Sequence, residues 1–349
     1  MAASVYGAET SAAAAADLER TAFRRAEKKY KLYKSPLPKS RKKITVTKPT
    51  LDLAEVIDFR GAINESPPYR MGVIKVDCSD FDRPVFGLSD HPGFYFIPNA
   101  LSIEEQCHWI GESLQSFPQP PNRTNLTPFY GPIYDLFGAA KRLQVFSNLE
   151  NPGNYQGDSQ KETMDSCKHP PIPATKLLRK LRWSTLGLQF DWSMRNYNVS
   201  LPHNKIPEGL CKLAKKMASP AMSKGEEFRP EAAIVNYYGP SDMLGGHVDD
   251  MEADWSRPIV SISLGCKAVF LLGGKTREDD PIAMYVRSGD IVLMAGEARE
   301  CFHGVPRIFI DEESAEIDSL ATQFTSKDEK FILDYIRNSR ININIRQVN

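Results

Sequence analysis

The stretch Arg340-Ile341-Asn342-Ile343-Asn344-Ile345-Arg346 near the C-terminus alternates strictly between polar and apolar residues. Successive side chains of a β-strand point to opposite faces, so this pattern predicts a strand with one apolar face and one face carrying two Arg and two Asn. If the polar face meets solvent, the strand is an ordinary edge of an antiparallel sheet. If it points into a barrel, both guanidinium groups need anionic partners, because unpaired buried charges are costly. A dicarboxylate ligand would provide such partners, since Arg pairs bidentately with carboxylates.

The segments upstream of this stretch predict a protein built mainly from short strands with flanking helices. An aromatic strand bounded by turn formers is expected at 92–98, and Ser102-Ile103-Glu104-Glu105 has the pattern of a capping box that opens a helix. Further helices are expected at 210–217 and around 136–145. The other expected strands are 183–190, 232–238, 259–264, 268–272, 283–286, 291–294 and 341–348. Several short strands at this spacing favour an α+β fold of the sandwich or jelly-roll type.

Composition excludes several classes of protein. With 41% hydrophobic and 25% charged residues, the chain of 349 residues is typical of a folded protein. The absence of an apolar run of about 18 residues argues against an integral membrane protein. The net charge is zero, but residues 20–43 contain eleven Lys or Arg against the single acid Glu27. Such a run could hold nucleic-acid phosphates, act as a nuclear localisation signal or be a solvated basic tail.

His247-Val248-Asp249 is the first candidate for a metal site. On a strand, His247 and Asp249 share one face and could offer a nitrogen and a carboxylate oxygen to the same metal. A facial triad for non-haem Fe(II) requires a second His. His303 is the best candidate, because it lies in the strand-rich half of the chain, although a histidine satisfied within the core would have the same sequence. By the same reasoning Asn236 and Tyr238 share one face of the strand at 232–238.

The order and spacing of these motifs resemble the AlkB family of Fe(II)- and 2-oxoglutarate-dependent nucleic-acid dioxygenases. Within that family the sequence is most similar to the AlkB homologue 1 branch, on the segment 183–192, the long stretch between His303 and Arg340, and the N-terminal extension. The motifs that carry the resemblance are 236–238 (NYY), 247–249 (HVD), 258–265 (PIVSISLG), 268–274 (AVFLLGG), 288–290 (SGD), 303–305 (HGV) and Arg340 followed by Arg346.

The resemblance implies a double-stranded β-helix (jelly roll) that uses Fe(II), 2-oxoglutarate and O2. It implies that His247, Asp249 and His303 hold the iron as the catalytic centre. The residues implied to bind 2-oxoglutarate, with Arg340 on the distal carboxylate, are Asn236, Tyr238, Arg340, Asn342 and Arg346. A lid with an aromatic strand would contact the base, and the corresponding residues are Leu188, Gln189, Phe190, Trp192 and Tyr197.

The resemblance also implies a domain organisation. Residues 1–85 would form a basic extension, partly disordered or helical. Residues 86–230 would form the N-terminal part of the catalytic domain with the nucleotide-recognition lid, and residues 231–349 the double-stranded β-helix core. The protein is expected to be a monomer without a membrane association, in the nucleus and/or cytoplasm, with the mitochondrion as an alternative.

Three departures from the family pattern concern the substrate. The family pattern has an acidic residue two positions after the metal-binding Asp, and this sequence has Met251 there. Glu252 is adjacent but would face away from the site on a strand. Leu188 replaces the first aromatic residue of the lid. Residues 308–338 contain eight acids against three bases, a charge that repels a phosphate backbone.

The main expectation is oxidative demethylation of methylated bases in tRNA, other RNA or DNA, with release of formaldehyde and succinate. Unpaired bases are favoured, since they need not be flipped out of a duplex. One alternative is the same oxygenase chemistry on a protein such as a methylated histone, because the metal site does not select the substrate. Another alternative is a non-catalytic nucleic-acid binder that uses the basic run at 20–43.

Overall fold

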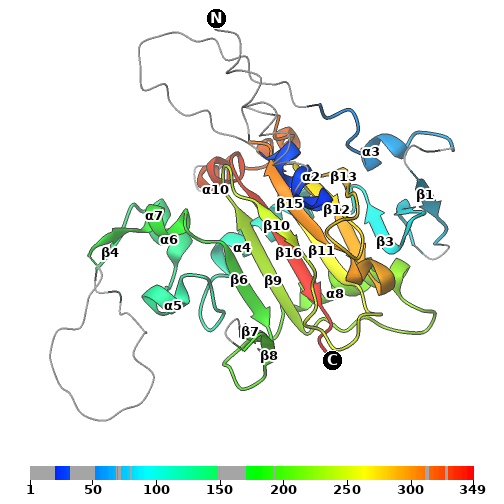
Figure 1. Cartoon of the computed structure of the whole chain (residues 1–349). Helices are drawn as coiled ribbons and strands as arrows, with labels where there is room; N and C mark the ends of the chain where they lie inside the picture. The colour runs from blue at the N-terminus through cyan, green and yellow to red at the C-terminus, as the bar shows by residue number, and fades with distance from the viewer. Residues whose placement is uncertain are drawn as a thin grey trace, which may run out of the picture.

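The computed structural model describes residues 20–31, 52–67, 69, 72–78, 81–147, 149, 170–191, 194–310, 314–326 and 329–349. Its centre is a pair of antiparallel sheets that face each other (Figure 1). The large sheet contains, in order, β1 (Val73–Val76), β2 (Val85–Leu88), β3 (His91–Ile97), β14 (Ile291–Met294), β11 (Ile259–Gly265), β16 (Arg340–Arg346), β9 (Ala232–Tyr238) and β6 (Trp183–Gly187). The small sheet contains β10 (Leu244–His247), β15 (His303–Ile308), β12 (Ala268–Leu272) and β13 (Ile282–Val286). The predicted jelly-roll fold is confirmed.

β16 lies in the middle of the large sheet, paired with β11 on one side and β9 on the other. The alternating sequence therefore places its two faces in different environments. The apolar residues Ile341, Ile343 and Ile345 are fully buried in the hydrophobic layer beneath the helices. The polar residues Arg340, Asn342 and Arg346 are almost fully buried on the opposite face, inside the cup between the sheets. Of the two arrangements that the pattern allows, the interior one is correct.

Helices cover the outer face of the large sheet. They are α4 (Ile103–Gln115), α5 (Thr127–Tyr130), α6 (Leu136–Lys141), α7 (Ala174–Leu178), α8 (Glu208–Ala218) with the 3-10 turn η1 (Ser219–Ala221), α9 (Asp318–Ala321) and α10 (Lys330–Ile336). The capping box predicted at Ser102 is present, with Ser102 and Glu105 each accepting a backbone N–H of the other. None of the helices in the described ranges is long and apolar enough to span a membrane.

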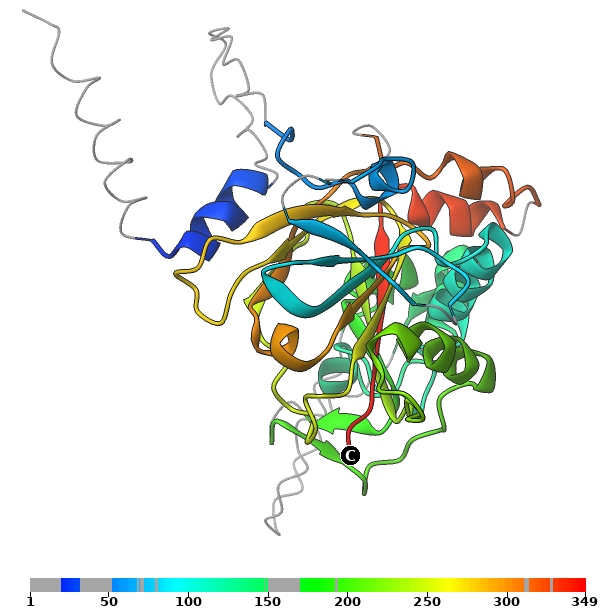
Figure 2. The same cartoon turned by 90° about the vertical axis from the view of Figure 1, so that its right-hand side faces the viewer.

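Segments near the N-terminus belong to the core. α3 (Phe59–Ala62) inserts Phe59 between the sheets, where its ring stacks on Phe96 with centroids 4.3 Å apart. Asp58 caps α3 and binds both terminal nitrogens of Arg287, at 2.9 and 2.8 Å. α2 (Ala22–Tyr30) packs on the opposite side of the molecule from the other helices, against the small sheet (Figure 2). The packed core therefore begins well before the strand expected at 92–98.

Two local expectations are wrong. The strand expected at 183–190 is broken at Leu188, where the chain leaves β6 and enters the hairpin of β7 (Gln189–Asp191) and β8 (Asn196–Asn198). The strand that carries His247 ends at that residue, so Asp249 lies in the following loop rather than on the same strand face. The remaining short elements are the β4 (Val145–Phe146) and β5 (Ile172–Pro173) pair and the 3-10 turn η2 (Gly296–Glu300).

Candidate active site

The structure brings His247, Asp249 and His303 together at one end of the cup. Their ligand atoms all lie within 4.8 Å of one another. The carboxylate of Asp249 is 3.8 Å from Nε2 of His247 and 3.6 Å from Nε2 of His303. β10 and β15 are paired, with His247 directly opposite His303, which explains how the two imidazoles meet. Two imidazole nitrogens and one carboxylate oxygen are the donors of the facial triad that binds Fe(II).

Hydrogen bonds orient both imidazoles for metal binding. Nδ1 of His247 lies 2.9 Å from the carbonyl of Gly245, and Nδ1 of His303 lies 3.3 Å from the carbonyl of Cys301. Because a carbonyl only accepts, each Nδ1 carries the proton and each Nε2 keeps its lone pair toward Asp249. Burial and the adjacent imidazole of His303 lower the pKa of His247 to about 4, so its ring is neutral at physiological pH.

Asp249 is held as a carboxylate by its neighbours. Burial alone would raise its pKa, but the guanidinium of Arg346, 3.0 Å away, holds that pKa well below the ordinary value. Arg299 donates to the backbone carbonyl of Asp249 at 3.0 Å and thereby fixes the loop. The site therefore presents an ionised oxygen ligand without a metal to stabilise it.

Glu252 links this centre to the lid. Its side chain is buried and pairs with Arg299 at 2.6 Å and Arg346 at 3.3 Å. It also accepts a hydrogen bond of 2.8 Å from the hydroxyl of Tyr197, on β8. The expectation that Glu252 faces away from the site is wrong, because residues after His247 are not in a strand and the loop turns this side chain inward.

A first cavity extends from the triad along the polar face of β16. It is lined by Ser261, Arg340, Asn342 and Asn344 together with the triad. Arg340 is 2% exposed and donates one hydrogen bond, to Ser263 at 3.0 Å. Within the described residues its Nε and Nη1 atoms have no hydrogen-bond partner, nor has the hydroxyl of Tyr238 beside it. Burial lowers the pKa of Arg340 and raises that of Tyr238 to about 12. Such a buried, unpaired cation requires an anion.

A second cavity, of about 450 Å³, opens on the other side of the triad. Phe190, Arg195 and Tyr197 of the lid form one wall, and the loop from Val248 to Glu252 forms another. Phe190 and Tyr197 pack edge to face, with ring centroids 5.2 Å apart. Asn236 and Asn344 contribute amide groups to the same cavity. The metal site therefore lies at the junction of two cavities.

Comparison with known proteins places this geometry in a family. The sequence model of the 2OG-Fe(II) oxygenase superfamily matches residues 133–346. The chain is 59% identical over 342 residues to the DNA N(6)-methyladenine demethylase ALKBH1A of Arabidopsis thaliana, which covers 95% of this chain and 97% of that protein. It is 31% identical to the nucleic acid dioxygenase ALKBH1 of Homo sapiens (86% and 80% covered) and 28% identical to the tRNA demethylase abh1 of Schizosaccharomyces pombe (93% and 95% covered).

The chain belongs to the 2OG-Fe(II) oxygenase superfamily, in its AlkB homologue 1 branch. Members of this superfamily use Fe(II), 2-oxoglutarate and O2, and the residues present fit that set. The two imidazole nitrogens and the ionised Asp249 match the ligand preferences of Fe(II). The unpaired guanidinium nitrogens of Arg340 match one end of a dicarboxylate.

The other residues predicted to bind 2-oxoglutarate lie in different parts of the site. Tyr238 and Asn342 lie near Arg340, although the amide of Asn342 already donates to Ser261 and to the carbonyl of Ile262. Asn236 faces the second cavity. Arg346 is paired with Asp249 and Glu252, so its described contacts hold the metal-binding carboxylate. Cosubstrate contacts of Asn236 and Arg346 remain predictions.

Only some of the lid residues predicted to contact a base line the second cavity. Phe190 and Tyr197 line the second cavity, whereas Leu188 and Gln189 do not. Gln189 is fully buried, and its amide bonds to Thr185, the carbonyl of Gly187 and the N–H of Arg123. Gln189 therefore attaches the lid to β6. Trp192 lies outside the described residues.

Sequence reasoning missed several residues of the site. Asn344 belongs to the same alternating stretch as Arg340, and the period of two could have placed it in the cup. Glu252 and Arg299 form a buried pair 47 residues apart, which no local pattern reveals. Glu27 is also buried at the site, although it lies in the basic run at 20–43.

Glu27 connects α2 to the metal-binding strand. Its Oε1 accepts a hydrogen bond of 2.6 Å from the backbone N–H of Gly246, the residue before His247. The ring of Phe23 packs so closely on Gly246 that a Cβ there would overlap it. Arg277 donates to the carbonyl of Gly246 at 2.7 Å. α2 thus fixes the backbone from which His247 projects.

We expect Glu27→Ala to destabilise the protein by about 1–3 kcal/mol, because the N–H of Gly246 loses its buried acceptor. Iron retained after dialysis should decrease together with the urea midpoint. Glu27→Gln keeps an acceptor oxygen and serves as the matched control, with a smaller loss. Wild-type stability and iron retention in Glu27→Ala would show that α2 does not support His247.

Proposed function

We propose that this protein oxidatively removes methyl groups from nucleobases in RNA or DNA, with unpaired bases as its preferred substrates. The observation that carries the proposal is the second cavity, whose aromatic wall lies directly beside the triad. The names of the relatives from Arabidopsis thaliana, Homo sapiens and Schizosaccharomyces pombe, which refer to DNA N(6)-methyladenine, nucleic acid and tRNA, support the same substrate class.

The size and chemistry of the second cavity suit a single base. A volume of about 450 Å³ accepts a small planar group. Tyr197 is fixed by Glu252 and Phe190 packs on it, so the aromatic wall is organised before a ligand arrives. Asn236 and Asn344 offer donors and acceptors for the polar edge of a base. Arg195, an exposed residue of the cavity wall that lies 3.6 Å from Asp250, can attract a phosphate.

The protein's own residues position the reactants and exclude water. When bound, Fe(II) with 2-oxoglutarate and O2 supplies the oxidising chemistry that hydroxylates a methyl group. His247, Asp249 and His303 would hold the metal, and Arg340 would hold the far carboxylate of the cosubstrate. An N-hydroxymethyl group is unstable and breaks down to the free amine and formaldehyde. The lid keeps the methyl group facing the metal, as required when the cofactor performs the chemistry.

Turnover of defined substrates tests this proposal. We expect formaldehyde and succinate in equal amounts from single strands that carry 1-methyladenine, 3-methylcytosine or N6-methyladenine. The same strands annealed to a complement should react more slowly, because flipping a base costs a few kcal/mol. 5-Methylcytosine, whose methyl group is on carbon, should release no formaldehyde in a single oxidation. Equal or faster release from methylated histone peptides would contradict the assignment to nucleic acid.

A further inference from the structure

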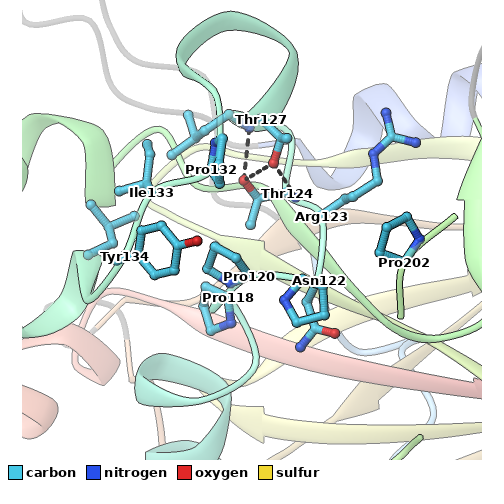
Figure 3. Close-up of a pocket in the computed structure, with 13 residues that line it drawn as sticks. Pro118, Pro120, Asn122, Arg123, Thr124, Thr127, Pro132, Ile133, Tyr134 and Pro202 are labelled. Atoms are coloured by element: carbon cyan, nitrogen blue, oxygen red, sulfur yellow. Dashed lines mark hydrogen bonds between the residues drawn. The ribbon is translucent and has the colours of Figure 1, made fainter. Parts of the chain in front are cut away.

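A second surface lies apart from the metal centre, where the chain between α4 and α6 forms an apolar groove (Figure 3). The groove has a volume of about 450 Å³. Pro118, Pro120 and Pro132 line it together with Ile133, and the ring of Tyr134 lies beside the proline rings (Figure 3). Tyr134 is 66% exposed, and Phe129 nearby is 61% exposed. Flat apolar and aromatic faces of this kind are open to a planar ligand.

Basic side chains surround this groove. Residues 118–206 contain eleven Lys or Arg against six Asp or Glu, in a chain whose total charge is zero. We define the basic face as six exposed residues on α6, on α7 and between α7 and β6. They are Lys141, Arg142, Lys176, Arg179, Lys180 and Arg182. Among the described residues, Asp135 lies 2.6 Å from Arg142 and Asp242 lies 3.4 Å from Arg182.

Hydrogen bonds join the groove to the basic face. Asn125 donates to the carbonyl of Lys180 at 2.8 Å and accepts the N–H of Arg182 at 2.7 Å. The ammonium of Lys180 lies 3.5 Å from the hydroxyl of Tyr130, next to Phe129. The backbone that carries Lys180 and Arg182 is therefore fixed to the segment that forms the groove.

The same segment is joined to the lid of the active site. The N–H of Arg123, in the wall of the groove, lies 3.2 Å from both Thr185 of β6 and Gln189 of the lid. Pro202, shortly after β8, completes the groove (Figure 3). β6 has five residues and is therefore about 16 Å long as an extended strand. A nucleic-acid strand would need only a few nucleotides to pass from the lid to the groove.

We propose that the groove and the basic face bind the single strand that flanks the modified base, with one flanking base stacked on Tyr134. This inference rests on the proposed function, which places the modified base in the second cavity. Stacking on an aromatic ring requires a base that is not paired within a duplex, and the neighbouring cations neutralise phosphates on either side of it.

Binding of unmodified oligonucleotides tests this surface without depending on turnover. The probes are single strands of about 5 and about 15 nucleotides, because only the longer one reaches beyond the lid. The first variant combines Lys176→Gln, Arg179→Gln and Lys180→Gln. For the longer strand we expect the slope of log Kd against log salt to decrease by about 2, and Kd at low salt to rise tenfold or more. The shorter strand should bind with wild-type affinity.

Tyr134→Ala tests the stacking step. We expect it to weaken binding of the longer strand roughly fivefold to hundredfold, the range for loss of one stacked base. Tyr134→Phe retains the ring and should bind normally. For the charge variant, the matched control is Lys212→Gln, Lys216→Gln and Lys224→Gln, which removes the same charge on and after α8.

Three results would overturn the inference. The first is wild-type affinity and salt slope for the longer strand in the charge variant. The second is an equal loss in the α8 control, which would indicate a general charge effect. The third is an equal loss for a duplex of the same length, which would exclude a single-strand site. Failure of the proposed function is seen separately, as an absence of formaldehyde from methylated strands with the wild-type enzyme.

Discussion

Asp249→Ala is expected to abolish turnover and to remove Fe(II) binding. Asp249 contributes the anionic oxygen of the triad, and its carboxylate lies within 4 Å of both metal-facing imidazole nitrogens. Two neutral imidazoles alone bind Fe(II) weakly, since carboxylate oxygen supplies the charge that a hard divalent ion prefers. We expect activity to fall at least a thousandfold, which corresponds to about 4 kcal/mol. Iron content after anaerobic loading and desalting, together with succinate formation, measures both effects.

Loss of Asp249 also changes the balance of buried charge. In the variant, Arg346 loses the Asp249 carboxylate at 3.0 Å and keeps Glu252 as a partner. The stability of the variant must therefore be measured before its activity is compared with that of the wild type. Asp249→Asn preserves shape and isolates the effect of charge. Asp254→Ala removes a nearby surface carboxylate, which caps the turn at Ser256, and should retain iron. A folded Asp249→Asn protein with normal iron content would remove Asp249 from the metal site.

Much of the fold could be predicted because its strands are encoded locally. β9, β12 and β14 have the bounds that the sequence pattern indicates, and the Ser102 capping box begins α4 as expected. The bounds of β10 differ from the expectation, because the strand ends at His247 and does not include Asp249. Gly246 is needed for the close approach of Phe23 from α2, and Gly304 of β15 for its own close approach to the β10 backbone, both distant in sequence. β1 and β2 are not predicted for a similar reason, since β1 pairs with β2 and β2 with β3.

As in the fold, some residues of the candidate site can be predicted from the local sequence, and others depend on segments that are far away in the chain. The triad could be identified from the short motifs HVD at 247–249 and HGV at 303–305 and from their order in the chain. The side chains that support it could not. Glu27, Glu252 and Arg299 carry charges that, in an isolated segment, indicate an exposed surface. Their burial results from pairing between elements up to hundreds of residues apart, such as Glu27 with Gly246. Whether the polar face of β16 points into the cup likewise depends on where the strand lies in the sheet, which its own sequence does not specify.

Arg340→Met is expected to raise the concentration of 2-oxoglutarate needed for half-maximal turnover roughly a hundredfold. The guanidinium has two nitrogen atoms, Nε and Nη1, without hydrogen-bond partners in the described protein, which are available to an anionic ligand. Each hydrogen bond to a charged group contributes about 1.5–3 kcal/mol, so loss of two is worth about 3 kcal/mol or more. Iron binding should be unchanged, because Arg340 is absent from the triad and its contacts.

Two controls separate a cosubstrate contact from a structural role. 2-Oxobutyrate has no distal carboxylate, so Arg340→Met should not weaken its use further, and the two losses should not add. Thermal stability gives the second control. Without cosubstrate, Arg340→Met removes an unpaired buried cation and should be as stable as wild type or more so. Added 2-oxoglutarate should raise the Tm of wild type but not that of the variant. Equal stabilisation of both proteins would place the distal carboxylate elsewhere.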